Sequence, residues 1–349
     1  MATPIYQFTR LPAAVTAATN AASAPRSRAP GERPRVGVIY NPRSHRNHGT
    51  DFDCGLSPQV HIAQPGEREQ LPSVLADFAA AGIDLLVING GDGTVRDVLT
   101  SGVPIFGDDW PAIAVLPKGK TNALTIDLGL PSDWTLEAAI AAFERGGRTC
   151  RRPIDITEIQ DPADRRAPHR VRGFILGAGA FTTATRAGQS AHRLGVFNAL
   201  AVGMTAAWAV GQWLFASRAN PYRRGAPMRI TLGAHKAAMA HSGQGDPGWR
   251  QMLFASTLER LPAGLAPFGK LKTGLKLVAL DQIDRRRALL IPRILRGKTP
   301  SRLRERGIHQ IATPEFTLAL GDAFILDGEA FPPGEYRVSQ GPPLAFVTP

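Results

Sequence analysis

A short apolar run that ends in a glycine-rich turn constrains the fold of this chain more than any other stretch. Residues 85–94 read LLVINGGDGT, and their first four side chains are apolar and partly β-branched, as in a buried parallel strand. The glycines then permit backbone conformations that other residues resist. Apolar residues with helical spacing follow from Val95, so the stretch predicts a strand, a tight turn and a helix N-terminus. Backbone N–H groups and the helix dipole converge in such a turn, which makes it a natural anion-binding site.

Two further strand–loop units lie nearby in the sequence. Val36–Tyr40 is a second apolar strand, followed by the donor-rich loop Asn41–Asn47, and Ile113–Leu116 is a third, followed by PKGKTN at residues 117–122. Each loop by itself is also explained by an ordinary turn. Strands that alternate with helices favour a parallel sheet, however, and all three loops would then leave its carboxyl edge, where open α/β folds bind ligands. The three loops together predict a nucleotide site. Helices are expected at Gln70–Ala81, from Val95 onward, and at Ala123–Leu128 and Leu136–Phe143.

Asp92, the acid within the glycine-rich turn, carries the same charge as a phosphate group. It is therefore suited to a metal ion, a metal-bound water or a nucleotide hydroxyl rather than to direct phosphate binding.

The composition limits the class of protein. A length of 349 residues allows two domains with sizeable cores. The 41 basic and 29 acidic residues give a net charge of +12, which favours nucleic acid, an anionic membrane surface or phosphorylated ligands as partners. Two cysteines cannot form a disulfide framework, so a reducing compartment is favoured.

Three segments are expected from the changes in composition. Residues 1–33 lack a signal-peptide core and are predicted to be a disordered leader, with an organelle transit peptide as the alternative. Residues 34–150 form the α/β domain. Residues 151–349 are predicted to be a mainly antiparallel β domain with a helical insertion at 186–218. Its strands are expected at Ile154–Ile156, Val171–Leu176, Met228–Leu232, Gln251–Thr257, Gly274–Leu280, Phe316–Leu320 and Ala323–Leu326.

Two stretches of the second domain have an unusual composition. Residues 194–217 contain no charged side chain, and a buried or groove-lining helix, a membrane-surface helix and a membrane span are all compatible with that. Between Arg285 and Arg306 the chain has nine basic residues and a single acid, Glu305. This run is either a solvated charged face or a surface that attracts anionic lipid headgroups. No nucleic-acid-binding motif accompanies it.

Near the C-terminus, Asp327 and Glu329 stand on either side of Gly328 at the end of a predicted strand. A β-turn explains this pattern, because Asp-Gly is a common turn pair. In an enzyme, one carboxylate could accept a proton while the other contacts a metal ion or positions its neighbour.

Together these motifs resemble the diacylglycerol kinase catalytic family, which includes bacterial lipid kinases and sphingosine kinases. The resemblance runs from about Arg35 to the C-terminus through VGVIYNPRS (36–44), VINGGDGTVRDVL (87–99), LPKGKTNALTIDLGL (116–130) and LDGE (326–329). GGDGT is shared with NAD kinases, but their downstream Asn-Glu motif is missing here. The resemblance implies an α/β N-terminal domain with a parallel-type, NAD kinase-like sheet, a mainly antiparallel β-sandwich C-terminal domain, and an active site between them.

The resemblance also implies roles for individual residues. Asp327 would be the general base on a lipid hydroxyl, Asp92 would hold ATP phosphates and Mg²⁺, and Glu329 would support the base or the metal ion. The residues implied to line the ATP site are Asn41, Pro42, Arg43, Ser44, Gly90, Gly91, Gly93, Thr94, Gly119, Lys120, Thr121 and Asn122.

The function expected from this resemblance is an ATP-dependent lipid kinase that transfers the γ-phosphate to a lipid hydroxyl of the diacylglycerol or sphingoid type. A soluble-substrate kinase of the NAD kinase-like superfamily and a non-catalytic lipid-binding homologue are the alternatives. The expected location is cytoplasmic and peripheral to a membrane, with anionic headgroups bound by Arg285–Arg306 and no nucleic-acid partner. A homodimer is left open.

Three features bear on how far the family's roles carry over. Lys120 and Ala123 replace the Thr and Asp that many members have at these positions. Lys270–Thr273 stands where bacterial members often carry an acidic pair for a structural magnesium, so no second metal ion is expected. The acidic GGDGT and LDGE motifs are intact, which argues against an inactive homologue.

Overall fold

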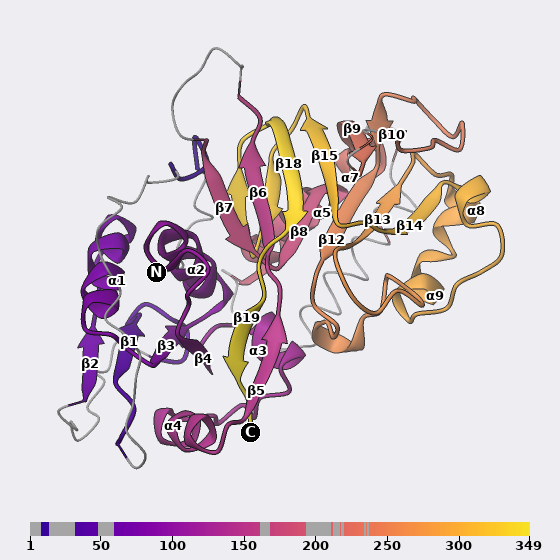
Figure 1. The fold of residues 1–349 in the computed structure, drawn as a ribbon. Helices are drawn as coiled ribbons and strands as arrows, with labels where there is room; N and C mark the ends of the chain where they lie inside the picture. The colour runs from indigo at the N-terminus through magenta and orange to yellow at the C-terminus, as the bar shows by residue number, and fades with distance from the viewer. Residues whose placement is uncertain are drawn as a thin grey trace. The chain divides into compact units, whose positions relative to one another are not determined.

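The computed structural model describes residues 8–13, 32–47, 59–160, 168–192, 211, 217, 220–233, 235 and 237–349. The chain divides into two compact units. The first, here the α/β unit, comprises residues 13–153 and 341–349, and the second, the β unit, comprises residues 1–12 and 154–340. Figure 1 shows both, with the chain coloured from indigo to yellow.

The α/β unit is built on a six-stranded sheet with the order β2–β1–β3–β4–β19–β5. Every pair is parallel except β19 with β5. The strands β1, β3 and β4 are buried along their whole length, as parallel strands covered on both faces must be. The strands are β1 (Val36–Tyr40), β2 (Val60–Ala63), β3 (Leu85–Gly90), β4 (Ala112–Pro117), β5 (Arg148–Arg151) and β19 (Leu344–Val347).

Helices cover both faces of this sheet. One face packs on α4 (Leu136–Glu144), whose Leu136, Ala139 and Phe143 join the core. On the other face Gly37 of β1 lies against Phe78 of α1 (Leu71–Ala80), where a Cβ would come within 2.7 Å of the ring. The remaining helices are η1 (Arg68–Gln70), α2 (Asp92–Phe106) and α3 (Ala123–Asp127). The strands and helices expected between residues 36 and 143 are therefore confirmed, apart from end positions.

The β unit is a sandwich of two antiparallel sheets. One has the order β10–β9–β15–β18–β6–β7, with β11 beside β9, and the other has the order β14–β13–β12–β8–β16–β17. Apolar side chains of both sheets, such as Ile156 and Leu318 from the first and Leu253 and Leu277 from the second, share one core. The predicted fold class is confirmed.

The elements of the β unit have the following bounds. The first sheet contains β6 (Ile154–Glu158), β7 (Arg170–Gly173), β9 (Ala226–Leu232), β10 (Ala237–Ala238), β11 (Trp249–Arg250), β15 (Glu315–Leu320) and β18 (Gly334–Gln340). The second contains β8 (Ile175–Gly179), β12 (Met252–Ser256), β13 (Lys276–Leu280), β14 (Ile308–Ala312), β16 (Phe324–Leu326) and β17 (Glu329–Phe331). The helices are α5 (Ala180–His192), α7 (Pro221–Arg224), η2 (Pro262–Gly264), α8 (Arg285–Ala288), α9 (Ile291–Leu295) and η3 (Arg304–Arg306).

The single strand predicted at Val171–Leu176 is two strands. β7 belongs to the first sheet and β8 to the second, and the chain passes from one sheet to the other at Phe174. The stretch reads VRGFIL and is buried on both sides of the crossing, and the single Gly173 does not by itself mark a break between two strands.

At each end of the chain, the observed units differ from the predicted domains. Residues 341–349 belong to the α/β unit, because β19 lies between β4 and β5. Residues 8–12 of the predicted disordered leader pack on the β unit: Phe8 stacks on Phe331 with ring centroids 4.7 Å apart, and Leu11 is buried in its core. The internal boundary, between Pro153 and Ile154, lies within a few residues of the predicted one.

The predicted helical insertion is described only in part. Its first residues belong to α5, and nearly all of the uncharged stretch 194–217 lies outside the described residues. In the part of the chain that the structure describes, no helix has the length and apolar character needed to cross a membrane.

Candidate active site

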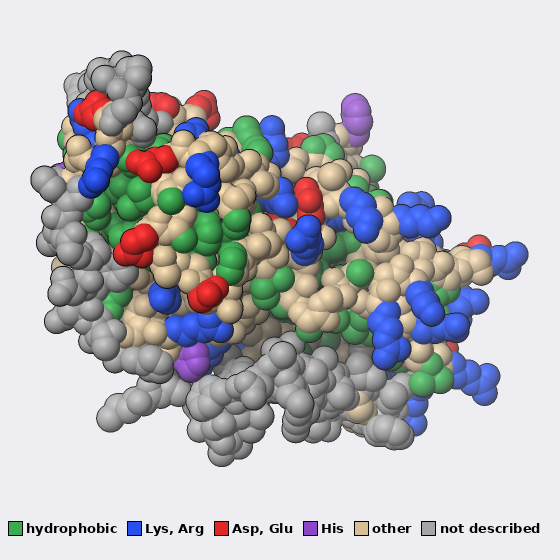
Figure 2. Space-filling model, turned by 90° about the horizontal axis from the view of Figure 1, so that it is seen from below, with side chains coloured by type: hydrophobic (Ala, Val, Ile, Leu, Met, Phe, Trp, Pro, Cys, Tyr) green, Lys and Arg blue, Asp and Glu red, His purple; other side chains and the backbone are tan. Residues whose placement is uncertain are grey.

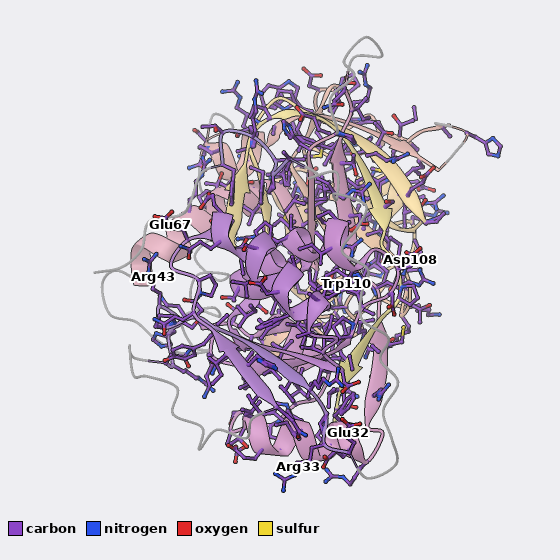
Figure 3. The ribbon with its side chains drawn as sticks, turned by 60° about the vertical axis from the view of Figure 1, so that its left-hand side comes forward. Glu32, Arg33, Arg43, Glu67, Asp108 and Trp110 are labelled. Atoms are coloured by element: carbon purple, nitrogen blue, oxygen red, sulfur yellow. The ribbon has the colours of Figure 1, made fainter. Side chains whose placement is uncertain are left out.

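The loops after β1, β3 and β4 meet at the carboxyl edge of the α/β sheet, as predicted. Asn41 N donates to Asn89 O at 3.1 Å, and Arg46 N donates to Lys118 O at 3.0 Å, so each loop is tied to a neighbour. In Figure 3, Arg33 marks the amino end of β1 and Arg43 lies at its carboxyl end. Parallel strands thus bring together three loops that are far apart in sequence.

Two glycines hold the second and third loops in backbone contact. A Cβ on Gly91 would lie 2.8 Å from the Cα of Gly119, and a Cβ on Gly119 would lie 2.6 Å from the Cα of Gly91. Only glycine fits at either position without moving the backbone. Gly91 is also the N-cap of α2, so the contact fixes the start of that helix.

Asp92 ties the glycine-rich turn to α3. Its carboxylate accepts hydrogen bonds from the N–H groups of Ala123 at 3.1 Å and Leu124 at 3.3 Å. Burial raises the pKa of Asp92, and these backbone N–H groups lower it in part. The carboxylate therefore accepts hydrogen bonds at the N-terminus of α3, while the first N–H groups of α2 have no intrahelical partner.

Asn122 has a backbone conformation that few residues adopt. Its φ is 52°, and its side chain is locked on Gly119, accepting from Gly119 N at 2.8 Å and donating to Gly119 O at 2.9 Å. Asparagine tolerates this left-handed region better than most side chains. Asn122 thus shapes the PKGKTN loop and stands at the N-cap position of α3, where its side chain makes no capping hydrogen bond.

The first loop is held by a chain of asparagines. Asn41 Nδ2 donates to Thr94 Oγ1 at 2.8 Å, which links the loop to the first turn of α2. Asn47 Nδ2 donates to Asn41 O at 2.7 Å and to Asn89 Oδ1 at 3.0 Å. Asn47 and Asn89 are buried and were not predicted as site residues. The signal in the sequence was an asparagine at the end of an otherwise apolar strand.

The other predicted residues of these loops lie nearer the solvent. Arg43, Lys120 and Thr121 are exposed, and Pro42 and Ser44 are half-buried. Arg43 N donates to Asn41 Oδ1 at 3.0 Å, so the backbone of this residue completes an Asx turn while its side chain is exposed.

In the β unit, Asp327 and Gly328 form the turn between β16 and β17. Their φ angles are 45° and 84°, as a two-residue hairpin turn requires. The Asp327 carboxylate accepts hydrogen bonds from Phe174 N at 3.0 Å and Ile175 N at 2.8 Å. It therefore binds the backbone at the point where the chain changes sheets. Gly173 makes room for it, since a Cβ there would approach Asp327 Oδ2 too closely.

Glu329 is the first residue of β17 and is half-buried, paired in register with Leu326. The predicted metal site would join Glu329 of the β unit to Asp92 of the α/β unit, so that pairing stays a prediction.

The expected magnesium ion would need side chains that can coordinate it. No group of three or more His, Cys, Asp or Glu side chains in the described ranges could hold a metal ion. Within the α/β unit each oxygen of the Asp92 carboxylate accepts one backbone N–H of α3, and its role as a metal ligand stays a prediction.

Comparison with known proteins shows that part of the chain is similar to a family of kinase domains. Residues 35–159 match the diacylglycerol kinase catalytic domain. Over 84 residues the chain is 31% identical to the probable lipid kinase YegS of Shigella flexneri and of Escherichia coli O1:K1 / APEC. The aligned stretch is 24% of this chain and only 28% of each relative.

Solved structures resemble nearly the whole chain. The crystal structure of a diacylglycerol kinase from Bacillus anthracis str. Sterne has a TM-score of 0.56 at 16% identity, covering 90% of this chain and 97% of that one. Two further structures from the same strain have TM-scores of 0.59 and 0.58 at 15% and 13% identity. These likenesses show a shared two-domain fold.

The fold thus consists of an α/β unit and an antiparallel sandwich, and it is shared with the solved structures over nearly the whole chain. Residues 35–159 match the diacylglycerol kinase catalytic domain, the family that the motifs resemble.

Proposed function

We propose that this protein is an ATP-dependent lipid kinase. The observation that carries the proposal is where the chain adopts positive φ. Among the described residues only four non-glycine residues do so, and two of them are Asn122 and Asp327. Both belong to motifs of the family, and both are held in this conformation by hydrogen bonds between side chain and backbone. Unusual backbone conformations of this kind cluster at functional sites.

The α/β unit supplies the chemistry for the nucleotide. The start of α2 presents backbone N–H groups and the positive end of a helix dipole, which suit a triphosphate. Lys118 and Lys120 add positive charge in the neighbouring loop. Phosphoryl transfer depends chiefly on positioning and charge neutralisation, and ATP would enter as its magnesium complex.

Asp327 would act on the acceptor. The lipid hydroxyl oxygen forms a bond to the γ-phosphorus as the bond from that phosphorus to the bridging oxygen breaks, which leaves ADP. The hydroxyl proton passes to the Asp327 carboxylate, the general-base role that a carboxylate performs well. Phe174 N and Ile175 N fix the carboxylate, so its orientation does not depend on the substrate.

A lipid acceptor is favoured by the family match of residues 35–159 and by the relatives' names, which read probable lipid kinase. Diacylglycerol and sphingoid bases are the acceptor types to test first. A soluble acceptor and a non-catalytic lipid-binding role are the competing functions.

The test is transfer of labelled γ-phosphate from magnesium–ATP to a panel of lipids in mixed micelles. We expect one organic-soluble product from the wild type and at least a hundredfold less from Asp327→Asn. Asp108→Asn, an exposed carboxylate in the α/β unit, is the matched control and should keep full activity.

Because Asp327 also binds the backbone, its variant needs a check of folding by thermal unfolding. A folded Asp327→Asn protein with unchanged transfer would remove Asp327 from the base role. Label appearing only in water-soluble products would favour the soluble-substrate kinase. ATP binding without any transfer would favour the binding protein.

A further inference from the structure

The connection between β13 and β14 carries an unusual share of the positive charge. Residues 281–307, here the basic connection, leave the second sheet after β13 and return at β14, forming α8, α9 and η3 on the way. They contain nine Lys and Arg residues and three acids, a net +6 out of the +12 of the whole chain. In Figure 1, α8 and α9 lie beside β13 and β14 at one end of the β unit.

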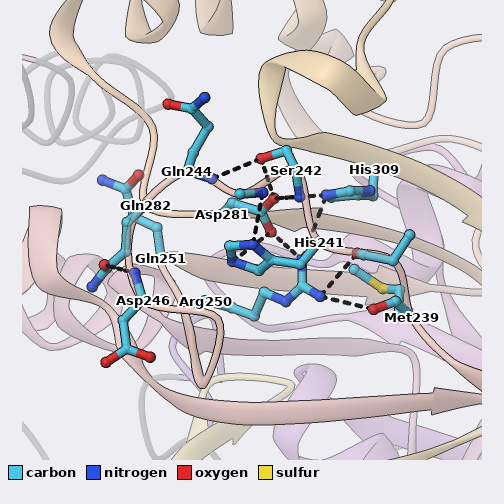
Figure 4. A network of polar contacts seen from close by, with 12 residues as sticks. Met239, His241, Ser242, Gln244, Asp246, Arg250, Gln251, Asp281, Gln282 and His309 are labelled. Atoms are coloured by element: carbon cyan, nitrogen blue, oxygen red, sulfur yellow. Dashed lines mark hydrogen bonds and ion pairs between the residues drawn. The ribbon is translucent and has the colours of Figure 1, made fainter.

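The base of the basic connection is held by a buried polar network, drawn in Figure 4. Asp281, fully buried, receives hydrogen bonds from Ser242 Oγ at 2.6 Å and Ser242 N at 2.8 Å, and pairs with Arg250. His309 Nε2 lies 3.0 Å from Asp281 Oδ2. Asp281 N also donates to Gly307 O at 2.9 Å, so the two ends of the connection are joined.

Apolar side chains fix the inner face of the connection. Ala288, Ile291, Ile294 and Leu303 are buried beneath the helices. Arg287 pairs with Asp284 at 2.9 Å and also donates to Gln244. Because its two ends are joined and its inner face is packed, the basic connection holds its outer side chains in one fixed arrangement.

The outer face combines cations with an apolar residue. Leu289, between α8 and α9, is 62% exposed, more than any other large apolar side chain among the described residues. Leu265, 37% exposed, precedes Ala266, whose N–H donates to Leu295 O at the end of α9 at 2.7 Å. The exposed cations are Arg285, Arg286, Arg293, Arg296, Lys298, Arg302 and Arg304. Figure 2 shows Lys and Arg side chains gathered at this end of the β unit, with hydrophobic side chains among them.

We propose that the basic connection docks the protein on an anionic membrane surface, with Leu289 among the lipid headgroups. This inference rests on the proposed lipid kinase function only for its purpose, which is to hold the enzyme where its substrate lies. The charge complementarity is direct, since juxtamembrane arginines and lysines are attracted to anionic lipids. An exposed leucine among them favours a lipid surface over nucleic acid, whose phosphates offer a leucine no apolar contact.

The test is sedimentation of the full chain with vesicles of phosphatidylcholine alone or with 30% phosphatidylglycerol. We expect binding to the anionic vesicles only. The variant Arg285→Gln/Arg286→Gln/Arg293→Gln should lower the partition coefficient by about 100-fold, since each basic residue near the surface contributes roughly fivefold. Leu289→Ser should lower it by about tenfold through lost apolar burial.

Matched variants control for charge and hydrophobicity. Arg145→Gln/Arg229→Gln/Arg337→Gln removes three exposed arginines elsewhere and should leave binding within about threefold of the wild type. Ile159→Ser removes an exposed apolar residue, 43% exposed, and should have no effect.

Equal losses in the two triple variants would overturn the proposal, because the binding would then follow net charge rather than this surface. Salt-sensitive binding to DNA that depends on the three arginines, without binding to anionic vesicles, would assign the surface to nucleic acid instead. Vesicle binding needs no catalysis, so Asp327→Asn should bind as the wild type does. Docking and phosphate transfer can therefore fail separately.

Discussion

At the residue scale, Asp281 gives a prediction about stability. It is buried with Arg250, and although burial raises its pKa, hydrogen bonds from His309 and Ser242 outweigh this and lower the pKa from 3.8 to about 2. The ionised group therefore stabilises the fold above pH 3.8 by about 2 kcal/mol, and this contribution disappears as the pH falls toward 2.

Asp281→Asn should therefore lower the free energy of unfolding at pH 7 by about 3 kcal/mol or more, since Arg250 would be left buried without its counter-charge. Between pH 4 and pH 2.5 the variant should lose less stability than the wild type. Urea unfolding at several pH values measures both effects, with Asp108→Asn as the exposed control. Parallel pH profiles of wild type and Asp281→Asn would contradict the assignment.

Gly91 gives a second prediction at this scale. Alanine there would put a Cβ 2.8 Å from the backbone of Gly119, so the glycine-rich turn and the PKGKTN loop would have to separate. Gly91→Ala should raise the Kd for ATP at least tenfold, measured by calorimetry. Gly66→Ala, whose Cβ would meet only the end of the Gln70 side chain at 3.7 Å, should leave the Kd unchanged. A normal Kd in Gly91→Ala would show that the contact does not shape the nucleotide site.

At the element scale, the N-terminal residues 8–12 are a structural part of the β unit. Phe8 N donates to Ala330 O at 3.0 Å, and Pro12 O accepts from Arg170 N at 2.9 Å, so the segment reaches strands of both sheets. Leu11→Ala should lower the free energy of unfolding by about 2–4 kcal/mol, as buried leucines commonly do. Arg10→Ala, exposed one position away, should change it by less than about 0.5 kcal/mol. Equal thermal stabilities of the two variants would show that the segment contributes nothing to the core.

The elements that the sequence predicted share a physical cause. β1, β3 and β4 are buried on both faces, so their residues form continuous apolar runs that end in polar loops. β5 reads RTCR with alternate residues exposed, and its strand state depends on pairing with β19. No local pattern could show that pairing, because almost 200 residues separate the two strands.

As with the strands, the sequence predicted only part of the candidate site. The parallel strands explain why the three loops meet, whereas the sequence does not predict the hydrogen bonds that hold the loops in place. The bond that Asn47 donates to Asn89 and the bonds that Phe174 N and Ile175 N donate to Asp327 depend on the register of distant segments. The motif letters therefore indicated a site without indicating what holds its residues.

At the scale of the whole molecule, both units are discontinuous in sequence. The chain passes from one unit to the other after residues 12, 153 and 340, so neither unit is formed by a single stretch. The last nine residues complete the α/β unit, and without them β5 would have no strand partner, because it pairs only with β19 in the described part of the sheet.

A chain that ends at Gly341 tests this dependence. Leu344, Phe346 and Val347 of β19 are all buried, so their loss removes apolar contacts and the ladder bonds to β4 and β5 together. Hydrogen exchange measured by mass spectrometry should show faster exchange in β4 and β5 than in the full chain. Peptides from β15 and β18, whose sheet is complete without β19, should keep their protection. If β4 and β5 stayed protected in the shortened chain, the α/β sheet would be stable without β19. A loss of protection in both units would instead show that the two unfold as one.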